Sequence, residues 1–291
     1  MLHAAALLLC AASLDQALPA VRKIADGSGA TIGVSAVHIE SGCRMSLRGD
    51  EPFPMQSVYK VAIAVHVLRR GADLDSVVTL TKDDIRLGVS PISDLLRAHP
   101  ERPVTRTVRE LLQSAVQISD NAASDAVLRL GGGPKAVMAT LRELHVSGIN
   151  VTESEGNMAK RFFSQPIARY LVDANNTATP NGMTDLLVAI QSGRAASPES
   201  TRFLLKWMTD TTTGANRLRA LLPPGTVIAH KTGTSGDLGG VNGCTNDAGI
   251  ITLPDGRGHL ALSVFTKGST RPETERERPI AAIARVLYDL K

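Results

Sequence analysis

The order of strand-like and helix-like segments constrains the fold of this 291-residue chain more than any other sequence feature. Segments rich in β-branched residues lie towards both chain ends, and helical patterns fill the middle. The predicted strands cover residues 31–39, 43–48, 226–230, 247–253 and 259–265. Each block of strands is small for a separate sheet. We therefore predict one antiparallel sheet built from both chain ends, with a helical segment inserted between them.

The inserted segment begins with an apolar stretch from Ser57 to Arg70, which stops at Gly71 and is typical of a buried helix. Thr107 and Glu110 form a capping box that opens another helix. Three prolines suit a first helical position: Pro134, Pro180 and Pro198. Apolar residues spaced three and four apart predict a closing helix: Ile280, Ile283, Leu287 and Leu290.

These patterns predict the α/β fold class, as an α+β sandwich whose antiparallel sheet is flanked by helices and carries an inserted all-helical domain. We place the α/β domain at residues 14–56 plus 210–291 and the helical domain at residues 57–209. The length suits one large domain or two domains in intimate contact. The active site is expected in the cleft between the two parts.

The composition narrows the range of partners. Hydrophobic residues make up 43% of the chain and charged residues 21%, as in ordinary globular proteins. The formal net charge is +4, and the cations are spread along the chain rather than gathered in a basic tract. We therefore expect no nucleic-acid partner. The mild positive charge is compatible with a pocket that attracts a carboxylate.

The N-terminus resembles a secretory signal. An apolar run at residues 4–12 ends in small residues, as the core of such a signal does. Because no Lys or Arg precedes the run, residues 1–13 are interpreted as a signal peptide or its remnant, and the first turn of an N-terminal helix is the alternative. Export implies a periplasmic or secreted protein. No stretch reaches the roughly 20 apolar residues of a membrane span, so we expect no stable membrane association.

Three short motifs occur in order along the chain: Ser57-Val-Tyr-Lys60, Ser119-Asp-Asn121 and Lys231-Thr-Gly233. On a helix, Ser57 and Lys60 lie on one face with about 5–6 Å between their Cβ atoms. A serine hydroxyl needs a base within reach to act as a nucleophile. A buried lysine near other cations can have its pKa lowered enough to accept the proton. The alternative is a surface lysine on an ordinary helix, but the helix around Lys60 is apolar nearly all round.

The second motif offers polar groups to the same chemistry. Ser119 can relay a proton towards a leaving nitrogen, and Asn121 can bind a substrate amide and also hold Lys60. Asp120 is expected to brace the loop. The alternative is a Ser-Asp-Asn cluster that only caps a helix.

The third motif lies at the end of a predicted strand. Four side chains there form a row of donors that faces the cleft and suits a carboxylate: Lys231, Thr232, Thr234 and Ser235. Gly233 is expected to let a substrate backbone approach closely. The N–H groups of Ser57 and Thr234 would form an oxyanion hole. The alternative is a strand that ends in a polar turn, but all three motifs in order are rare by chance.

With these motifs the chain resembles class A serine β-lactamases, within the superfamily that includes penicillin-binding proteins. The resemblance extends over residues 53–60, 108–111, 118–121, 213–236 and 246–256. It implies that Ser57 is the acylated nucleophile and Lys60 its base or relay. It also implies that Ser119 is a proton shuttle and that Lys231 anchors the substrate carboxylate. Two arginines are candidates to support that carboxylate by neighbourhood alone: Arg219 and Arg271.

The implied activity is hydrolysis of a small-molecule β-lactam, conferring resistance to penicillins and/or cephalosporins. No metal or organic cofactor is implied, because the nucleophile and both bases are protein groups. The sequence leaves the oligomeric state open, and a monomer is the default expectation. The three cysteines, Cys10, Cys43 and Cys244, match no metal-binding spacing. Cys43 and Cys244 are expected to be buried as small apolar side chains.

The chain departs from this family in the loop with the deacylating glutamate, where the family shows Glu-x-x-Leu-Asn. Placing Met158 at the Leu position makes Glu155 the catalytic base and leaves Ala159 where Asn is expected. The alternative register pairs Glu153 with Asn157. Because the glutamate and the Asn hold the hydrolytic water, Ala159 predicts intact acylation and slow turnover.

Two other functions share the acyl-enzyme chemistry. One is a D-Ala-D-Ala carboxypeptidase or penicillin-binding protein that deacylates slowly, and the other is a β-lactam sensor that is acylated once. The presence of Glu155 favours the hydrolase, because penicillin-binding proteins lack that residue. The preference among penicillins, cephalosporins and carbapenems stays open.

Overall fold

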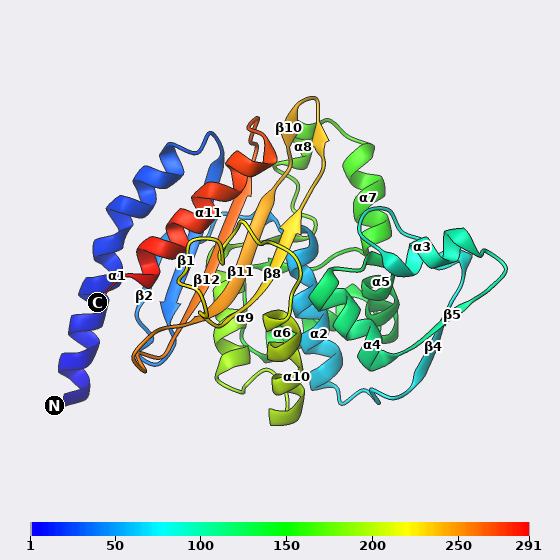
Figure 1. Ribbon diagram of the computed structural model, residues 1–291, viewed down its shortest axis with the longest axis horizontal. Coiled ribbons are helices and arrows are strands. Elements are labelled where there is room, and N and C mark those ends of the chain that lie inside the picture. Colours follow the sequence, from blue (N-terminus) through cyan, green and yellow to red (C-terminus); the bar gives the residue numbers. More distant parts are fainter. Residues whose placement is uncertain (1, 291) are drawn as a thin grey trace.

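A computed structural model describes the backbone of residues 2–290 and the side chains of residues 14–290. Figure 1 shows a central sheet with helices on both faces and a mainly helical body beside it, which confirms the predicted fold class. The strands are β1 (Thr31–His38), β2 (Arg44–Leu47), β3 (Phe53–Pro54), β4 (Val77–Leu80), β5 (Val104–Thr107), β6 (Ile149–Asn150), β7 (Thr177–Ala178), β8 (Ile228–Thr234), β9 (Asp237–Leu238), β10 (Val241–Asn242), β11 (Thr245–Thr252) and β12 (His259–Lys267).

The α-helices are α1 (Leu2–Asp26), α2 (Lys60–Arg69), α3 (Pro91–Ala98), α4 (Val108–Gln113), α5 (Asn121–Leu130), α6 (Pro134–Glu143), α7 (Glu155–Phe163), α8 (Ile167–Tyr170), α9 (Pro180–Gln191), α10 (Pro198–Thr209) and α11 (Glu273–Tyr288). Short helical turns are η1 (Gln56–Tyr59), η2 (Lys82–Asp84) and η3 (Ser114–Ile118). The limits of the two predicted domains, at residues 56/57 and 209/210, stay predictions.

The main sheet joins strands from both chain ends, as the sequence predicts. Its order is β2-β1-β12-β11-β8, and all neighbouring strands are antiparallel. β1 pairs with β12, so that Ala36 lies opposite Leu262. The predicted end of the strand at residues 226–230 is wrong. β8 continues to Thr234, because its residues up to Thr234 pair with β11. The third motif therefore lies within a paired strand rather than at its end.

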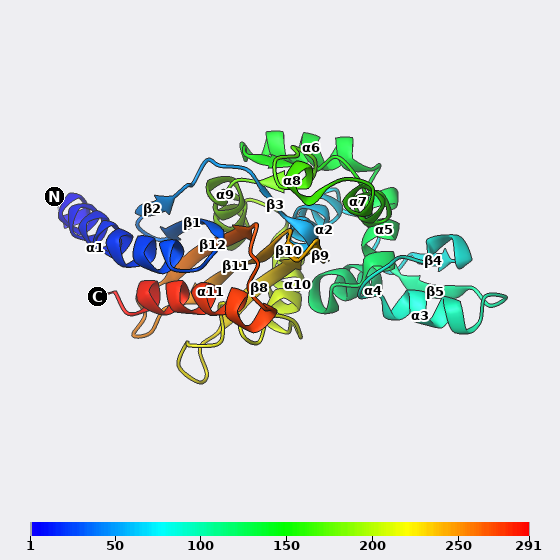
Figure 2. The same ribbon diagram turned by 90° about the horizontal axis from the view of Figure 1, so that it is seen from above.

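Two long helices cover one face of the sheet, which we call the outer face. Figure 2 shows α1 and α11 side by side across it. Val21 and Ala25 of α1 share one buried cluster with Ile280 and Ile283 of α11 and with Ile32 of β1. α9 packs on the opposite, inner face, which looks towards the helical body. The closing helix predicted from apolar spacing is confirmed as α11.

The helix predicted from residue 57 to residue 70 is divided in two. Gln56 enters η1 with a φ of +45°, which a regular helix start does not allow. The chain therefore makes the short turn η1, and α2 begins only at Lys60. α2 is buried along nearly its whole length, as its apolar sequence predicts, and Gly71 follows it with a φ of +66°. Ser57 consequently lies on the short turn rather than on the long helix.

The other helix signals are confirmed. Thr107 accepts a hydrogen bond from the Glu110 N–H at 3.2 Å, and the Glu110 carboxylate accepts one from the Thr107 N–H at 2.7 Å. The three prolines start α6, α9 and α10. Three small sheets, β3–β7–β6, β4–β5 and β9–β10, were not predicted, because strands of two to four residues are too short to show an alternating pattern.

α1 includes residues 2–13, which the sequence analysis interprets as a signal peptide or its remnant. The side chains of these residues, Cys10 among them, lie outside the described part, so that interpretation stays a prediction. Cys43 and Cys244 are buried, as expected. Within residues 2–290, no helix combines the length and the apolar character needed to cross a bilayer.

Thr107→Ala tests the capping box. The change removes the acceptor of the Glu110 N–H at the helix start, so the free energy of unfolding should fall by about 1 kcal/mol. Urea unfolding followed by circular dichroism measures this. Thr105→Ala, at an exposed position of β5, is the control and should change stability by less than about 0.5 kcal/mol. Equal losses in both variants would contradict the capping role.

Candidate active site

The edge of the main sheet positions the first motif. On the edge strand β8, a Cβ atom at Gly233 would lie only 2.2 Å from the Met55 carbonyl oxygen. On the neighbouring strand, the Asn246 side chain donates to the Pro54 carbonyl oxygen at 2.8 Å. These contacts hold η1, and with it Ser57, against the sheet. The close approach that the sequence analysis assigned to a substrate at Gly233 is made here by the chain's own backbone.

Ser57 lies half-buried on η1 with its hydroxyl directed at a carboxylate. The hydroxyl donates to Glu155 Oε1 at 3.4 Å. The preceding residue, Gln56, has a positive φ that is uncommon for a residue with a side chain. Its amide donates to the Tyr170 hydroxyl at 2.6 Å, which holds the strained residue in place. Strain of this kind is typical of functional sites.

Lys60 is buried, and acceptors surround its ammonium group. Nζ donates to the Ser119 carbonyl oxygen at 2.8 Å and to Asn121 Oδ1 at 2.6 Å. Glu155 Oε1 lies 3.1 Å from the same nitrogen. No direct hydrogen bond joins Lys60 to Ser57 in the described part of the chain. The Glu155 carboxylate therefore bridges the two residues that the first motif was expected to bring together.

The second motif forms a turn between η3 and α5. Ser119 has a φ of +66°, and its hydroxyl accepts from Lys231 at 2.9 Å and from Lys60 at 3.4 Å. Asp120 caps α5 by accepting a backbone N–H of the first turn at 3.0 Å. It also braces the loop by accepting from the Ser90 hydroxyl at 2.8 Å. Both interpretations of this aspartate, bracing and capping, therefore hold.

Glu155 opens α7 and is buried. Its backbone N–H donates to Asp125 of α5 at 2.7 Å, which ties the loop to the helical body. Met158, placed at the Leu position of the preferred register, is buried. Glu153, the base of the alternative register, instead pairs with Arg161 at 2.6 Å. The geometry thus supports the register with Glu155 beside Ser57.

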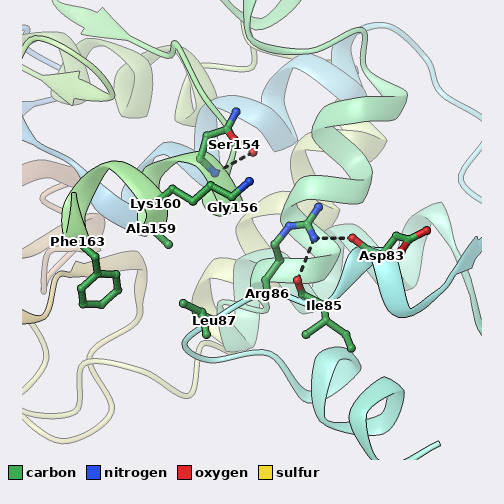
Figure 3. Close-up of a pocket in the computed structure, with 10 residues that line it drawn as sticks. Asp83, Ile85, Arg86, Leu87, Ser154, Gly156, Ala159, Lys160 and Phe163 are labelled. Carbon is green, nitrogen blue, oxygen red and sulfur yellow. Dashed lines mark hydrogen bonds between the residues drawn. The ribbon is translucent and has the colours of Figure 1, made fainter. Parts of the chain in front are cut away.

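A pocket of about 570 Å³ opens next to the first turn of α7 (Figure 3). Ala159 lies one turn after Glu155 on the same helix face and lines this pocket. Figure 3 shows Lys160 and Phe163 on the α7 side and Leu87 on the segment that precedes α3. The pocket therefore combines apolar walls with two cations, Arg86 and Lys160, and its lining includes Ser154 and Gly156 on either side of Glu155 in the chain.

Lys231 lies within β8 and is completely buried. Its Nζ donates to the Ser119 hydroxyl at 2.9 Å and to the next carbonyl oxygen of the strand at 3.0 Å. Burial lowers the pKa of Lys231 well below its usual value, and the charge of Lys60 lowers it further. The carboxylates of Glu155 and Asp247 raise the pKa of Lys231 and so oppose both effects.

The predicted row of donors is divided by the strand. Thr232 and Thr234 alternate with Lys231 and Gly233 along the strand. Because successive side chains of a strand point to opposite faces, both threonine side chains point away from the face of Lys231. The Thr232 hydroxyl lies 2.7 Å from the Thr213 hydroxyl. The Thr234 hydroxyl accepts from a guanidinium N–H at 2.7 Å. A ligand at this edge would therefore meet the ammonium group on one side and the threonine hydroxyls on the other.

The guanidinium beside Thr234 belongs to Arg217, which the sequence analysis missed. Arg217 is only 4% exposed and pairs with Glu277 of α11 at 2.9 Å. The two candidates named by neighbourhood lie elsewhere: Arg219 donates to a carbonyl oxygen at the end of α10, and Arg271, just before α11, pairs with Glu275 of that helix. Only burial separates Arg217 from Arg219, and a sequence pattern does not show it.

Two predicted substrate-binding residues are engaged with the protein itself. The Ser235 hydroxyl donates to the Gly236 carbonyl oxygen at 2.9 Å and accepts from the Cys244 N–H at 2.7 Å. Burial raises the pKa of the Cys244 thiol to about 12, so this cysteine is an inert packing group. Asn121 holds Lys60 as predicted, and its amide nitrogen donates to the Leu87 carbonyl oxygen at 2.6 Å.

Together these groups suit the transfer of an acyl group from an anionic ligand. Ser57 provides a hydroxyl with a carboxylate acceptor, and the Ser119 hydroxyl connects the two lysines. Lys231 and Arg217 make the end of β8 positive, which attracts an anion. Within the residues that the structure describes, no three His, Cys, Asp or Glu side chains are grouped to hold a metal.

The chain is similar to known proteins along most of its length. The sequence model described as "Beta-lactamase enzyme family" matches residues 16–290. The chain is 34% identical over 273 residues to the extended-spectrum beta-lactamase PER-1 of Pseudomonas aeruginosa, covering 93% of this chain and 86% of that protein. A β-lactamase structure from Chitinophaga pinensis DSM 2588 gives a TM-score of 0.86 at 36% identity, covering 94% and 98% of the two chains. An ancestral class A β-lactamase gives a TM-score of 0.79 at 30% identity, covering 94% and 98%.

Gly233→Ala tests the contact between β8 and η1. The added methyl group would overlap the Met55 carbonyl oxygen, so η1 has to move and the free energy of unfolding should fall by about 2 kcal/mol. Gly236→Ala, three residues later, is the matched control. A Cβ atom at Gly236 would come no closer than 3.3 Å to another residue, at Phe162 Cε1. Urea unfolding of both variants measures the difference. A Gly233 variant as stable as the control would contradict the proposed contact.

Proposed function

The chain belongs to the beta-lactamase enzyme family and is a class A β-lactamase, and from this premise we propose that it opens the lactam ring through a covalent acyl intermediate on Ser57. The observation that carries the proposal is a continuous series of contacts. It runs from the Ser57 hydroxyl through Glu155 to Lys60. Ser119 then joins Lys60 to Lys231. Such a series supplies a nucleophile, proton acceptors and an anion anchor in one place.

In the acylation step, the Ser57 oxygen attacks the lactam carbonyl carbon. The hydroxyl proton passes to the Glu155–Lys60 pair, which lies in contact with that oxygen. The lactam C–N bond breaks, and the leaving nitrogen takes up a proton through Ser119. The N–H groups of Ser57 and Thr234 are the donors that we assign to the developing oxyanion. The product of this step is an ester between Ser57 and the opened ring.

In the deacylation step, a water molecule attacks the ester carbonyl carbon. Glu155 accepts a proton from the water, the ester C–O bond breaks, and the Ser57 oxygen recovers a proton. The opened product leaves with a new carboxylate. Ala159 occupies the position one turn after Glu155 and has no amide to hold the water, so we assign the slow step to deacylation.

The substrate class follows from the charges around β8. Penicillins and cephalosporins carry a carboxylate beside the lactam ring, and an ammonium group with hydroxyl neighbours binds such an anion. We assign this carboxylate to Lys231, with the Thr232 and Thr234 hydroxyls beside it and Arg217 behind them. Asn121 is assigned to the amide of the acyl side chain.

The slow-deacylating alternatives, a carboxypeptidase, a penicillin-binding protein or a sensor, are less favoured because Glu155 lies directly against Ser57. We further propose that the enzyme acts as a monomer in the periplasm or as a secreted protein. The apolar run at residues 4–12 supports export. The proposed reaction uses protein groups alone.

Variants at Ser57 and Glu155 separate the two chemical steps. Ser57→Ala should lower the turnover of a chromogenic cephalosporin by about 10⁴-fold or more, because the nucleophile is gone. Glu155→Gln should form the acyl-enzyme and then stall. Absorbance reports turnover, and intact mass reports a stable adduct of one β-lactam in the Glu155 variant.

Glu153→Gln is the matched control for this experiment, because its carboxylate contacts Arg161 and not Ser57. It should retain roughly the wild-type rate. A trapped adduct in the Glu153 variant but not in the Glu155 variant would establish the other register. A single stoichiometric burst in the wild-type protein would indicate one of the slow-deacylating alternatives. Neither adduct nor turnover would refute the acyl-enzyme mechanism.

Ala159→Asn tests the origin of slow deacylation. The new amide would lie on the helix face of Glu155 and could hold the hydrolytic water. One added hydrogen bond of about 1.4 kcal/mol corresponds to an approximately tenfold faster deacylation. Single-turnover kinetics with a cephalosporin measure the rate constant. Ala159→Leu fills the same space without a donor and should give no increase, and equal rates in both variants would disprove the explanation.

A further inference from the structure

A buried histidine–carboxylate contact lies behind the third motif and has no part in the proposed reaction. His230 Nδ1, on β8, lies 2.9 Å from both carboxylate oxygens of Asp247, on β11. Both side chains are 0% exposed. They project from the outer face of the sheet, away from Ser57. A charge buried this completely is costly unless other charges compensate it.

The pair carries a net negative charge. A carboxylate only accepts hydrogen bonds, so His230 donates the proton of Nδ1 to Asp247. His230 Nε2 is buried and meets no hydrogen-bond partner among the residues that the structure describes. A second ring proton there would be buried without an acceptor, which is unfavourable. The histidine is therefore neutral, and Asp247, which also accepts from the Leu218 N–H at 3.2 Å, keeps its charge.

The other buried charges near the pair already compensate one another. On the outer face, Arg217 pairs with Glu277 of α11 at 2.9 Å, and the exposed Glu273 lies 3.9 Å from the same guanidinium. On the inner face, Lys60 pairs with Glu155 at 3.1 Å. Among the described residues, Lys231 has no ion pair, and Asp247 has none apart from the histidine contact. The buried Asp120, next to Ser119, has no ion pair either, but it accepts from the Ser90 hydroxyl and from backbone N–H groups of the helical body.

Lys231 and Asp247 are neighbours in the sheet. Asp247 lies opposite Thr232 in the β8–β11 register, one residue from Lys231. Their side chains leave opposite faces, so the interaction acts through the thin, water-free sheet, where charges are screened little. The Glu155 charge and, to a smaller extent, the Asp247 charge raise the pKa of Lys231, against the lowering by burial, by Lys60 and by Arg217.

We propose that the His230–Asp247 pair is a positioning element that keeps Lys231 in the cationic form required to bind the substrate carboxylate. The inference rests on the proposed β-lactamase function and concerns the regulation of that site. The neutral histidine fixes the carboxylate without cancelling its charge. If that charge is removed, Lys231 loses its proton at a lower pH, so carboxylate binding is lost at a lower pH.

Asp247→Asn tests this, because the amide is nearly isosteric and can still accept from the Leu218 N–H. The measurement is kcat/KM between about pH 6 and pH 10 for a cephalosporin and for its neutral methyl ester. The ester lacks the carboxylate, so the ratio of the two values isolates the charge of Lys231 from other pH effects on the reaction. We expect the ratio to fall at a pH about one unit lower in the variant, with the loss in KM rather than kcat.

Asp84→Asn is the matched control, because it removes another buried carboxylate, which pairs with Arg129 of the helical body at 3.0 Å. Its ratio should follow the wild-type curve. An unshifted curve for Asp247→Asn, or the same shift in the control, would overturn this inference and leave the proposed function intact. Absence of turnover in the wild-type enzyme would refute the proposed function and this inference with it.

His230→Gln decides the question if the Asp247 variant does not fold. Glutamine can donate to Asp247 and leaves its charge in place, so the ratio should fall at the wild-type pH or above. A fall about one unit lower would overturn the proposal, because the shape of the pair rather than its charge would then control Lys231.

Discussion

The burial of two ammonium groups around a single hydroxyl determines the rest of this site. Lys60 and Lys231 approach the Ser119 hydroxyl to 3.4 and 2.9 Å. Two like charges in a dry interior repel each other, and each loses its hydration, at a cost of several kcal/mol unless carboxylates compensate them. Glu155 does so by contact and Asp247 through the sheet. Groups that we assign to the reaction therefore also make the burial tolerable, so we expect changes to these groups to affect both activity and stability.

Backbone strain gathers at the same place. Gln56 and Ser119 both have positive φ angles. Gln56 precedes Ser57, and Ser119 carries the hydroxyl that both lysines contact. Conformations of this kind cost about 1–3 kcal/mol each and persist only where the surroundings hold them. Tyr170 holds the first through its hydroxyl, and Lys60 holds the second through the Ser119 carbonyl oxygen. The groups that we assign to the reaction are thus held in place by the protein itself, and such preorganisation favours catalysis by avoiding reorganisation.

Most of the correct predictions from the sequence rest on local patterns. Alternating strands, the capping box at Thr107 and the prolines that start helices are properties of a few adjacent residues. The three motifs likewise name side chains that the structure brings together in one site. The features that escaped prediction depend on contacts between distant segments. Arg217 differs from Arg219 only by its burial under α11, and the divided donor row and the His230–Asp247 pair arise from the register between β8 and β11. Such a register becomes visible only once the sheet is assembled.

The pairing of β1 with β12 also governs how the chain acquires its structure. The helical body lies between these strands in sequence, and the only other neighbour of β1 in the sheet is the four-residue β2. Helices form from local contacts, whereas closing so long a loop is slow. During synthesis from the N-terminus, the apolar strand β1 therefore waits without its main partner until the last part of the chain emerges. In that interval it is the segment of the sheet most open to aggregation, and to chaperones that prevent it.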